Sequence, residues 1–221
     1  MLNSQATNYK SQVGQDQFLN EFYFKNKRNG IFIDIGAHDG ISLSNTWFFE
    51  KELGWHGICF EPLPTVFKEL EKNRNCICIN KCVSADTIGT VLFREVTGYS
   101  QMLSGIEALY DPRHIERIRR EIECMGGSAR LIEVPCCLLN PELEKYNIYY
   151  IDFLSLDTEG GEINILKSIN YEKFYIYAIT VENNYGTSEI RKFLESKNFQ
   201  FITILGGADE IYINKKIYDH K

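Results

Sequence analysis

The chain has 221 residues and a formal net charge of -6, from 24 Lys+Arg against 30 Asp+Glu, and a negative protein repels the phosphate backbone of a nucleic acid. Its hydrophobic content of 44% can form one sizeable core, so residues 1–221 are expected to fold as a single domain. No apolar run approaches the roughly 20 residues of a membrane-spanning helix, and the N-terminus lacks a signal-peptide pattern, which predicts a soluble, cytoplasmic protein with no membrane span.

Helices and strands alternate in the first half of the chain. Apolar residues at helical spacing predict helices, and continuous apolar runs that end at glycine or proline predict buried parallel strands. In chain order we expect a helix at 13–24, a strand at 30–36, a helix at 43–54, a strand at 56–62, a helix at 64–73 and a strand at 76–84.

The same alternation returns after residue 148. We expect a strand at 149–157, a helix at 161–169, a strand at 176–182, a helix at 187–198, and closing strands at 199–205 and 209–216. The short segment GGA between the last two strands is typical of a hairpin, so the sheet should end with one antiparallel strand. The pattern predicts an α/β fold with a seven-stranded, mostly parallel, doubly wound sheet and helices on both faces.

The alternation stops between residues 97 and 139. This region contains a strongly charged helix, DPRHIERIRREIECMGG, and no strand pattern follows it at once. Most of its charges are explained by a helix surface that faces solvent. Insertions in open α/β sheets commonly lie over the carboxyl ends of the strands, where ligands bind, so we predict that residues 97–139 form a lid.

The seven cysteines do not follow the paired spacing of a zinc ribbon or a secreted disulfide framework. Cys76, Cys78 and Cys82 include an i, i+2 pair, but they lack the usual C-x2-C pairs and a fourth ligand. We therefore interpret them, with Cys136 and Cys137, as reduced thiols of the core rather than a zinc site.

The segment IDIGAHDG follows the first predicted strand and precedes a helix. Gly36 and Gly40 allow a tight turn that brings backbone amides close to a ligand. It is not a dinucleotide motif, because Ala37 replaces a glycine and Asp39 puts a carboxylate where phosphates would bind. A carboxylate at this place favours a cofactor that has positive charge and no phosphate.

Glu61 ends the second predicted strand, at the position where doubly wound folds bind ribose hydroxyls. The loop and this acid together indicate S-adenosylmethionine, which carries a sulfonium, an ammonium and an unphosphorylated ribose. Taken alone, Glu61 could also be a strand-end cap. Ser84 or Asp86, at the end of the third strand, could contact the adenine edge.

The blocks SQVGQDQFL, GIFIDIGAHDGISLSNTWFFEKELGWHGICFEPLP, IDFLSLDTEGGEINILKSI, AITVENN and DEIYIN resemble the FkbM-type methyltransferases over nearly the whole chain. The resemblance implies a Rossmann-like class I fold and O-methylation, often of sugar or polyketide-type hydroxyls. It also implies that Asp34, Gly36 and Asp39 line the methionine part of the cofactor, Glu61 the ribose, and GYSQMLSG the nearby variable loop. The full set of predicted cofactor residues is Asp34, Gly36, Ala37, His38, Asp39, Gly40, Asn45, Glu61, Ser84 and Asp157.

Acidic and amide residues end two neighbouring predicted strands. Asp157 ends one, and Glu182 with Asn183 ends the next, so all three could meet at the same edge of the sheet. Their oxygens suit Mg²⁺ or Mn²⁺, an arrangement similar to that of metal-dependent O-methyltransferases. A divalent ion would lower the pKa of an acceptor hydroxyl, and Asp157, Glu159 or His114 is the candidate base.

Blander interpretations of these residues stay open. Glu159 could only favour the dipole of the following helix, His114 could face solvent, and the acids could act through charge or hydrogen bonds without a metal. An N-methyltransferase, an NAD-dependent oxidoreductase and a non-catalytic glycan-binding module are the alternative functions. The expected partner is a small-molecule or glycan acceptor, and a homo-oligomer is compatible with the sequence.

Overall fold

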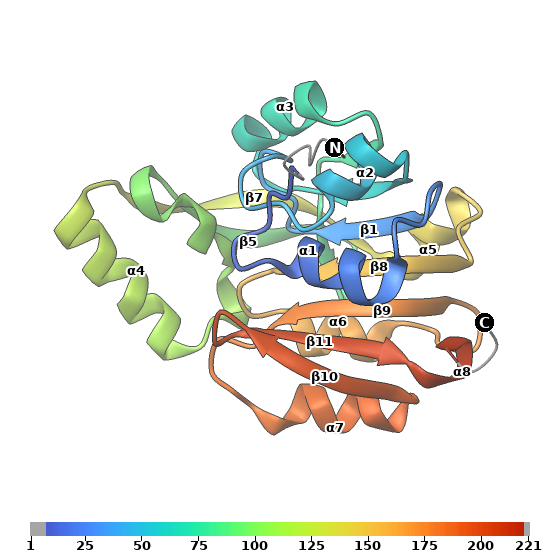
Figure 1. Ribbon diagram of the computed structural model, residues 1–221. Coiled ribbons are helices and arrows are strands. Elements are labelled where there is room, and N and C mark those ends of the chain that lie inside the picture. The colour runs from blue at the N-terminus through green and yellow to red at the C-terminus, as the bar shows by residue number, and fades with distance from the viewer. Residues whose placement is uncertain (1–7, 219–221) are drawn as a thin grey trace, which may run out of the picture.

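A seven-stranded sheet forms the centre of the computed structural model, which describes residues 8–218 (Figure 1). The strand order is β10-β11-β9-β8-β1-β2-β3, and only β11 runs antiparallel to its neighbours. The strands are β1 (Ile31–Ile35), β2 (His56–Phe60), β3 (Ile77–Ile79), β8 (Tyr150–Leu156), β9 (Tyr175–Glu182), β10 (Phe199–Leu205) and β11 (Asp209–Asn214). The predicted mostly parallel sheet with one antiparallel strand is confirmed.

Helices cover both faces of this sheet, as predicted. One face carries α1 (Gln15–Leu19), its π-helical continuation η1 (Asn20–Phe24), α2 (Trp47–Leu53) and α3 (Pro64–Asn73). The other carries α5 (Leu139–Lys145), α6 (Glu162–Ser168) and α7 (Ser188–Ser196), and a short α8 (Lys215–Tyr218) follows β11. Within residues 8–218, none of the helices has both the length and the apolar character needed to cross a membrane.

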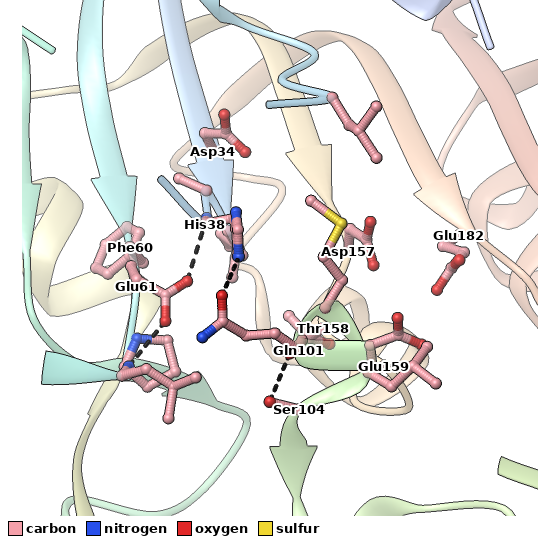
Figure 2. A pocket seen from close by; sticks show the side chains of 18 of the residues that line it. Asp34, His38, Phe60, Glu61, Gln101, Ser104, Asp157, Thr158, Glu159 and Glu182 are labelled. Atoms are coloured by element: carbon pink, nitrogen blue, oxygen red, sulfur yellow. Dashed lines mark hydrogen bonds between the residues drawn. The ribbon is translucent and has the colours of Figure 1, made fainter. Parts of the chain in front are cut away.

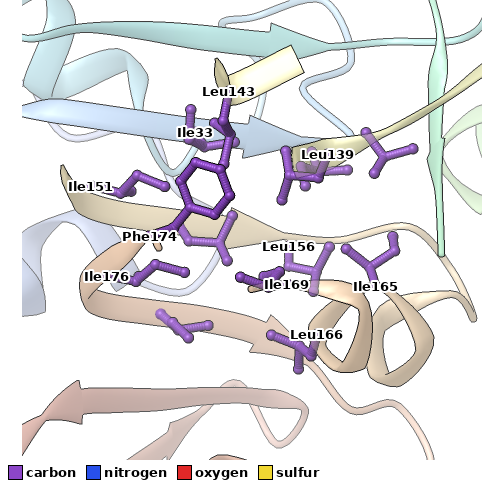
Figure 3. Close-up of a cluster of buried hydrophobic side chains, with 14 of the residues drawn as sticks. Ile33, Leu139, Leu143, Ile151, Leu156, Ile165, Leu166, Ile169, Phe174 and Ile176 are labelled. Atoms are coloured by element: carbon purple, nitrogen blue, oxygen red, sulfur yellow. The ribbon is translucent and has the colours of Figure 1, made fainter. Parts of the chain in front are cut away.

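Alternate residues of each strand supply the two cores. Ile33 and Ile35 of β1 belong to the same core cluster as Leu143 and Leu166 from the helices of one face. Figure 3 shows Ile33, Leu143 and Leu166 of this cluster. Phe32 points to the opposite face, among the aromatic residues of α1, η1 and α2. Strands buried on both faces lose the alternation of polar and apolar residues, which explains why their sequences are continuous apolar runs.

A second sheet, in the order β4-β7-β5-β6, corrects two sequence predictions. Its strands are β4 (Cys82–Ser84), β5 (Gly89–Val96), β6 (Gly105–Ile106) and β7 (Ala129–Leu138). The strand predicted at 76–84 is divided between β3 and β4, which belong to different sheets. A strand does follow the charged helix, because β7 begins at Ala129 and pairs with β5. The last part of the region 97–139 thus belongs to this second sheet, and the lid role of the region stays a prediction.

The charged helix is α4 (Pro112–Met125), preceded by the 3-10 helices η2 (Gly98–Leu103) and η3 (Glu107–Leu109). Asp111 accepts a hydrogen bond from the backbone N–H of Arg113 at 2.8 Å and so caps its first turn. Only His114 and Ile118 of α4 are buried, and its other side chains include exposed ion pairs such as Arg119 with Glu116. The helix lies beyond the carboxyl ends of β1, β8 and β9 (Figure 1).

Candidate active site

A cavity of about 400 Å³ opens where the parallel strands end. This volume is in the range of small-molecule sites. The strand ends and the loops that follow them contribute Asp34, Phe60, Glu61, Ser155, Asp157 and Glu182. The region of η2 and α4 contributes Tyr99, Gln101, Met102, Leu103, Arg117 and Glu121. Figure 2 shows Glu61 and His38 on one side of the cavity and the carboxyl groups of Asp157, Glu159 and Glu182 on the other.

Gly36 lets the loop after β1 turn directly against the end of β8. A Cβ atom at Gly36 would lie 1.8 Å from the backbone oxygen of Asp157, and the φ of Gly36 is +92°. The N–H groups of Gly36 and Ala37 both donate to the carbonyl oxygen of Phe60, at 3.1 and 3.0 Å. This position has no room for a side chain, so the loop is held against both neighbouring strands.

Gly36→Ala should destabilise the protein by about 3 kcal/mol or more, because the new methyl group meets backbone that cannot move away. In a domain of this size the Tm should fall by roughly 6–12 °C, as measured by scanning calorimetry. Gly207→Ala is the matched control, since Gly207 also has a positive φ, +89°, but no atom within 4 Å of the place that a Cβ would take. Equal losses in the two variants would show that steric contact with β8 is unimportant.

Glu61 anchors the same loop while it lines the cavity. Its Oε2 accepts from the backbone N–H of His38 at 3.1 Å, and its Oε1 accepts from that of Leu63 at 2.8 Å. Burial raises the pKa of Glu61 to about 7, against the lowering effect of these two hydrogen bonds. The Nε2 of His38 also lies 3.2 Å from Oε1 of Gln101, which joins the loop to η2.

Asp34 and Asn45 place oxygen atoms near the β1 end of the cavity. Thr46 donates its hydroxyl to Oδ2 of Asp34 at 2.5 Å, and burial raises the pKa of Asp34. Asn45 donates from Nδ2 to the hydroxyl of Ser155 at 3.0 Å. Its Oδ1 is buried and has no hydrogen-bond partner among residues 8–218. A buried acceptor left unpaired is costly, so this position suits a ligand that donates a hydrogen bond.

Three residues predicted to bind the cofactor do not line this cavity. The carboxylate of Asp39 instead accepts from the N–H groups of Ile41 and Ser42, at 2.9 and 2.7 Å. Gly40 packs against the side chain of Arg74, and the hydroxyl of Ser84 accepts from the N–H of Thr87 at 3.2 Å. These residues stabilise the turns around the cavity and do not line it.

Asp157, Glu159 and Glu182 form a cluster of carboxyl groups in which one oxygen from each lies within 4.8 Å of the others. Removal from bulk water, and then the negative charge of neighbouring acids, raises the pKa of Asp157 and Glu159 well above their usual values. The same causes raise the pKa of Glu182 to about 9. Carboxylates packed this closely repel one another unless a proton or another cation is shared between them.

Glu159 has contacts with α4 and with the turn after β9. Its φ is +60°, which is uncommon for a residue with a side chain, and the side chain is 9% exposed. Nδ1 of His114 lies 3.5 Å from its Oε2, and Nδ2 of Asn184 donates to the same oxygen at 3.3 Å. His114 is buried, stacks on Tyr110, and has a pKa lowered by burial, so it is not the solvent-facing helix residue of the blander interpretation.

Asn183 is not brought into the cluster. Its Oδ1 accepts from the N–H of Thr187 at 3.0 Å, and its Nδ2 donates to the carbonyl oxygen of Thr187 and to Oε1 of Glu210. It is 6% exposed and does not line the cavity. Its amide is therefore used to fix the turn after β9, while Glu159 takes the third position beside Asp157 and Glu182.

Two residues that support the site, Glu162 and Arg74, were not predicted from the sequence. Glu162 accepts from the backbone N–H groups of Thr158 and Gly160, at 2.9 and 3.0 Å, and so holds the turn that carries Glu159. The spacing T-x-x-x-E is one residue longer than the capping box, so no standard sequence pattern indicates this arrangement. Arg74 is buried behind the β1 loop, and no local pattern around it predicts this position.

The family described as "Methyltransferase FkbM domain" matches residues 34–201. None of the curated proteins compared matches the chain. Similar solved structures include a TehB-like SAM-dependent methyltransferase from Corynebacterium glutamicum, with 7% identity, a TM-score of 0.46, and coverage of 93% of this chain and 89% of that one. A methyltransferase from Geobacter sulfurreducens has 10% identity, a TM-score of 0.47, and coverage of 93% and 82%. Fibrillarin from Aeropyrum pernix, bound to S-adenosyl-L-methionine, has 11% identity, a TM-score of 0.47, and coverage of 93% and 75%. Because these TM-scores are below 0.5, the structural similarities carry no argument, and the family assignment rests on the match to residues 34–201.

Proposed function

The chain belongs to the methyltransferase FkbM domain family, and from this premise we propose that it methylates a hydroxyl group of a sugar with the help of a divalent cation. Membership of the family makes it a methyltransferase that uses S-adenosylmethionine. It also favours this function over a nicotinamide-dependent oxidoreductase or a non-catalytic glycan-binding module. Our proposal adds that the acceptor is a hydroxyl group of a sugar and that a divalent cation takes part. It also adds that the enzyme is cytoplasmic and acts on a small molecule or a glycan.

The residues on the Glu61 side of the cavity suit S-adenosylmethionine, which supplies a methyl group activated by a cationic sulfur when it is bound. Asp34 offers negative charge, and the unpaired Oδ1 of Asn45 offers an acceptor for an ammonium group. Glu61 lies at the end of β2, where its carboxyl group suits ribose hydroxyls. His38 and Gln101 would then cover this ligand from the loop and from η2.

The cluster of Asp157, Glu159 and Glu182 is the observation that carries the proposed cation and the hydroxyl acceptor. Hard carboxylate oxygens are the ligands that Mg²⁺ and Mn²⁺ prefer, and a bound ion would lower the pKa of an acceptor hydroxyl. We assign Asp157 and Glu182 to the ion and Glu159 to the proton of the acceptor. His114 would orient Glu159 from α4, with η2 and α4 as the lid over the acceptor.

Ligand-dependent thermal unfolding tests both parts of the proposal. S-adenosylhomocysteine at about 100 times its Kd should stabilise the protein by about 2.7 kcal/mol, whereas NAD should leave the Tm unchanged. Mn²⁺ should raise the Tm of the wild type and not that of Glu182→Gln. A shift with S-adenosylhomocysteine but none with Mn²⁺ or Mg²⁺ would reject the cation and reopen N-methylation. No shift with S-adenosylhomocysteine would contradict the cofactor assignment.

A further inference from the structure

Three cysteines, two of them in the neighbouring strands β2 and β3 and one just before β3, lie on the sheet face covered by α2 and α3. Cys59 of β2 is paired in register with Cys78 of β3, and Cys76 lies two residues before Cys78. The Sγ atoms of Cys59 and Cys76 are 3.5 Å apart, and the Sγ of Cys78 lies 3.7 Å from the carbonyl oxygen of Cys76. Two free thiols are therefore already in contact in the folded protein.

The two thiols in contact differ in exposure and in charge environment. Cys59 is fully buried, and burial raises the pKa of its thiol. Cys76 is half-buried, in a bend before β3, and hydrogen bonds with the neighbouring thiols, together with the guanidinium of Arg74, lower its pKa. A half-buried thiol with a lowered pKa, 3.5 Å from a buried second thiol, is the arrangement of a reactive cysteine with a resolving partner.

We propose that Cys59 and Cys76 are a redox modification site, which hydroperoxides convert into a disulfide. The sulfur of Cys76 attacks one oxygen of hydrogen peroxide, the O–O bond breaks, and Cys76 becomes a sulfenic acid as one water leaves. The sulfur of Cys59 then attacks the sulfur of Cys76, the S–O bond breaks, and the hydroxyl leaves with the thiol proton as a second water. Two thiols lose two electrons in total, and one peroxide is reduced to two waters.

Bond formation should also disturb the cofactor loop, a consequence that rests on the proposed function. The sulfur atoms must approach from 3.5 Å to about 2 Å, and Cys76 is the one that can move, because Cys59 is fixed inside β2. Arg74, two residues before Cys76, donates to the carbonyl oxygen of Gly40 and to the hydroxyl of Thr46. Movement of Cys76 therefore loosens the support of the loop that would bind S-adenosylmethionine.

Peptide mapping of the whole protein after treatment with hydrogen peroxide decides the proposal. Cys124→Ser is the background, because Cys124 is exposed and could join two molecules. Mass spectrometry should find the peptide with Cys59 bound to residues 75–81, which trypsin leaves intact with both Cys76 and Cys78. The bond should survive Cys78→Ser and disappear in Cys76→Ser. A bond that persists in Cys76→Ser, or a Cys76 oxidised to sulfinic acid with no bond, would overturn the proposal.

Calorimetric titration with S-adenosylhomocysteine measures the consequence for the loop. The oxidised protein should bind at least about threefold more weakly than the reduced protein, and dithiothreitol should restore the affinity, a change of about 0.6 kcal/mol or more. Equal affinity of the reduced and disulfide-bonded forms would disprove the coupling to the loop. If the reduced protein binds no S-adenosylhomocysteine, the proposed function fails, whereas the mapping still decides whether the disulfide site exists.

Discussion

Replacing Asp157 with asparagine is expected to lower methyl transfer by at least about a hundredfold while it makes the folded protein more stable. The activity should fall because asparagine cannot supply the charge that we assign to cation binding beside Glu182. The stability should rise by roughly 1 kcal/mol, because one of three crowded carboxyl groups is removed. Methyl transfer from labelled S-adenosylmethionine and the Tm are the two measurements.

The gain in stability should grow with pH. The pKa of Asp157 is raised well above its usual value in the folded protein, and that of Glu182 is raised from 4.5 to about 9. The folded state therefore holds protons that the unfolded state has released. This contribution to the free energy of unfolding is fully present below the ordinary pKa, near pH 4, and is lost as the pH rises toward 9. Asp157→Asn removes one of these groups, so its Tm should fall less steeply between pH 6 and pH 9.

Asp152→Asn is the matched control for this prediction. Asp152 belongs to the same strand, but it accepts hydrogen bonds from Lys27 at 2.6 Å and from the N–H of Ile31 at 3.0 Å, away from the cavity. Its loss should destabilise the protein and leave methyl transfer unchanged. If Asp157→Asn proved as destabilising as Asp152→Asn, the carboxyl cluster would be a stabilising network rather than a strained site.

The strands that could be predicted from the sequence are those that are buried on both faces. β1, β8 and β9 are buried on both faces, so their apolar runs are visible in the sequence without knowledge of their neighbours. β7 was missed because much of it is exposed and Pro135 interrupts it, which leaves neither a continuous run nor a clean alternation. Its position depends on pairing with β5, and this long-range contact has no local signal.

The sequence predicts which strand ends form the candidate site, but it does not predict which side chains at those ends point into the cavity. Successive residues of an extended strand point to opposite sides, so Glu182 and Asn183 could not both face the cavity. That rule, applied to ENN, would have excluded Asn183 once Glu182 was assigned to the cavity. The burial of His114 depends on stacking with Tyr110 and on the approach of α4 to the sheet, which no spacing in the sequence indicates.

Arg74→Met should destabilise the protein by about 3–5 kcal/mol, because it removes the buried cation beside Glu50 and leaves, among residues 8–218, only the partly exposed Lys51, 3.4 Å away, as an ionic partner. The guanidinium of Arg74 has no exposed surface and forms an ion pair with Glu50, whose side chain is 5% exposed. It also donates to the carbonyl oxygen of Gly40 at 3.3 Å and to the hydroxyl of Thr46 at 3.0 Å, and Thr46 in turn donates to Asp34. The variant should therefore also bind S-adenosylhomocysteine more weakly than the wild type.

Arg94→Met is the matched control, because it removes an ion pair that is partly exposed rather than buried. Arg94 forms two hydrogen bonds with Glu107, at 2.7 and 2.5 Å, but the two side chains are 22% and 27% exposed. Water can solvate Glu107 after the substitution, so the cost should stay near 1 kcal/mol. Denaturant unfolding measures the free energy of unfolding of both variants. Glu50→Gln combined with Arg74→Met should recover part of the stability that Arg74→Met loses, since the buried charge of Glu50 is then gone. Equal costs for Arg74→Met and Arg94→Met would mean that Lys51, water or a proton compensates the charge of Glu50, and that burial of the Arg74 ion pair adds nothing to its contribution.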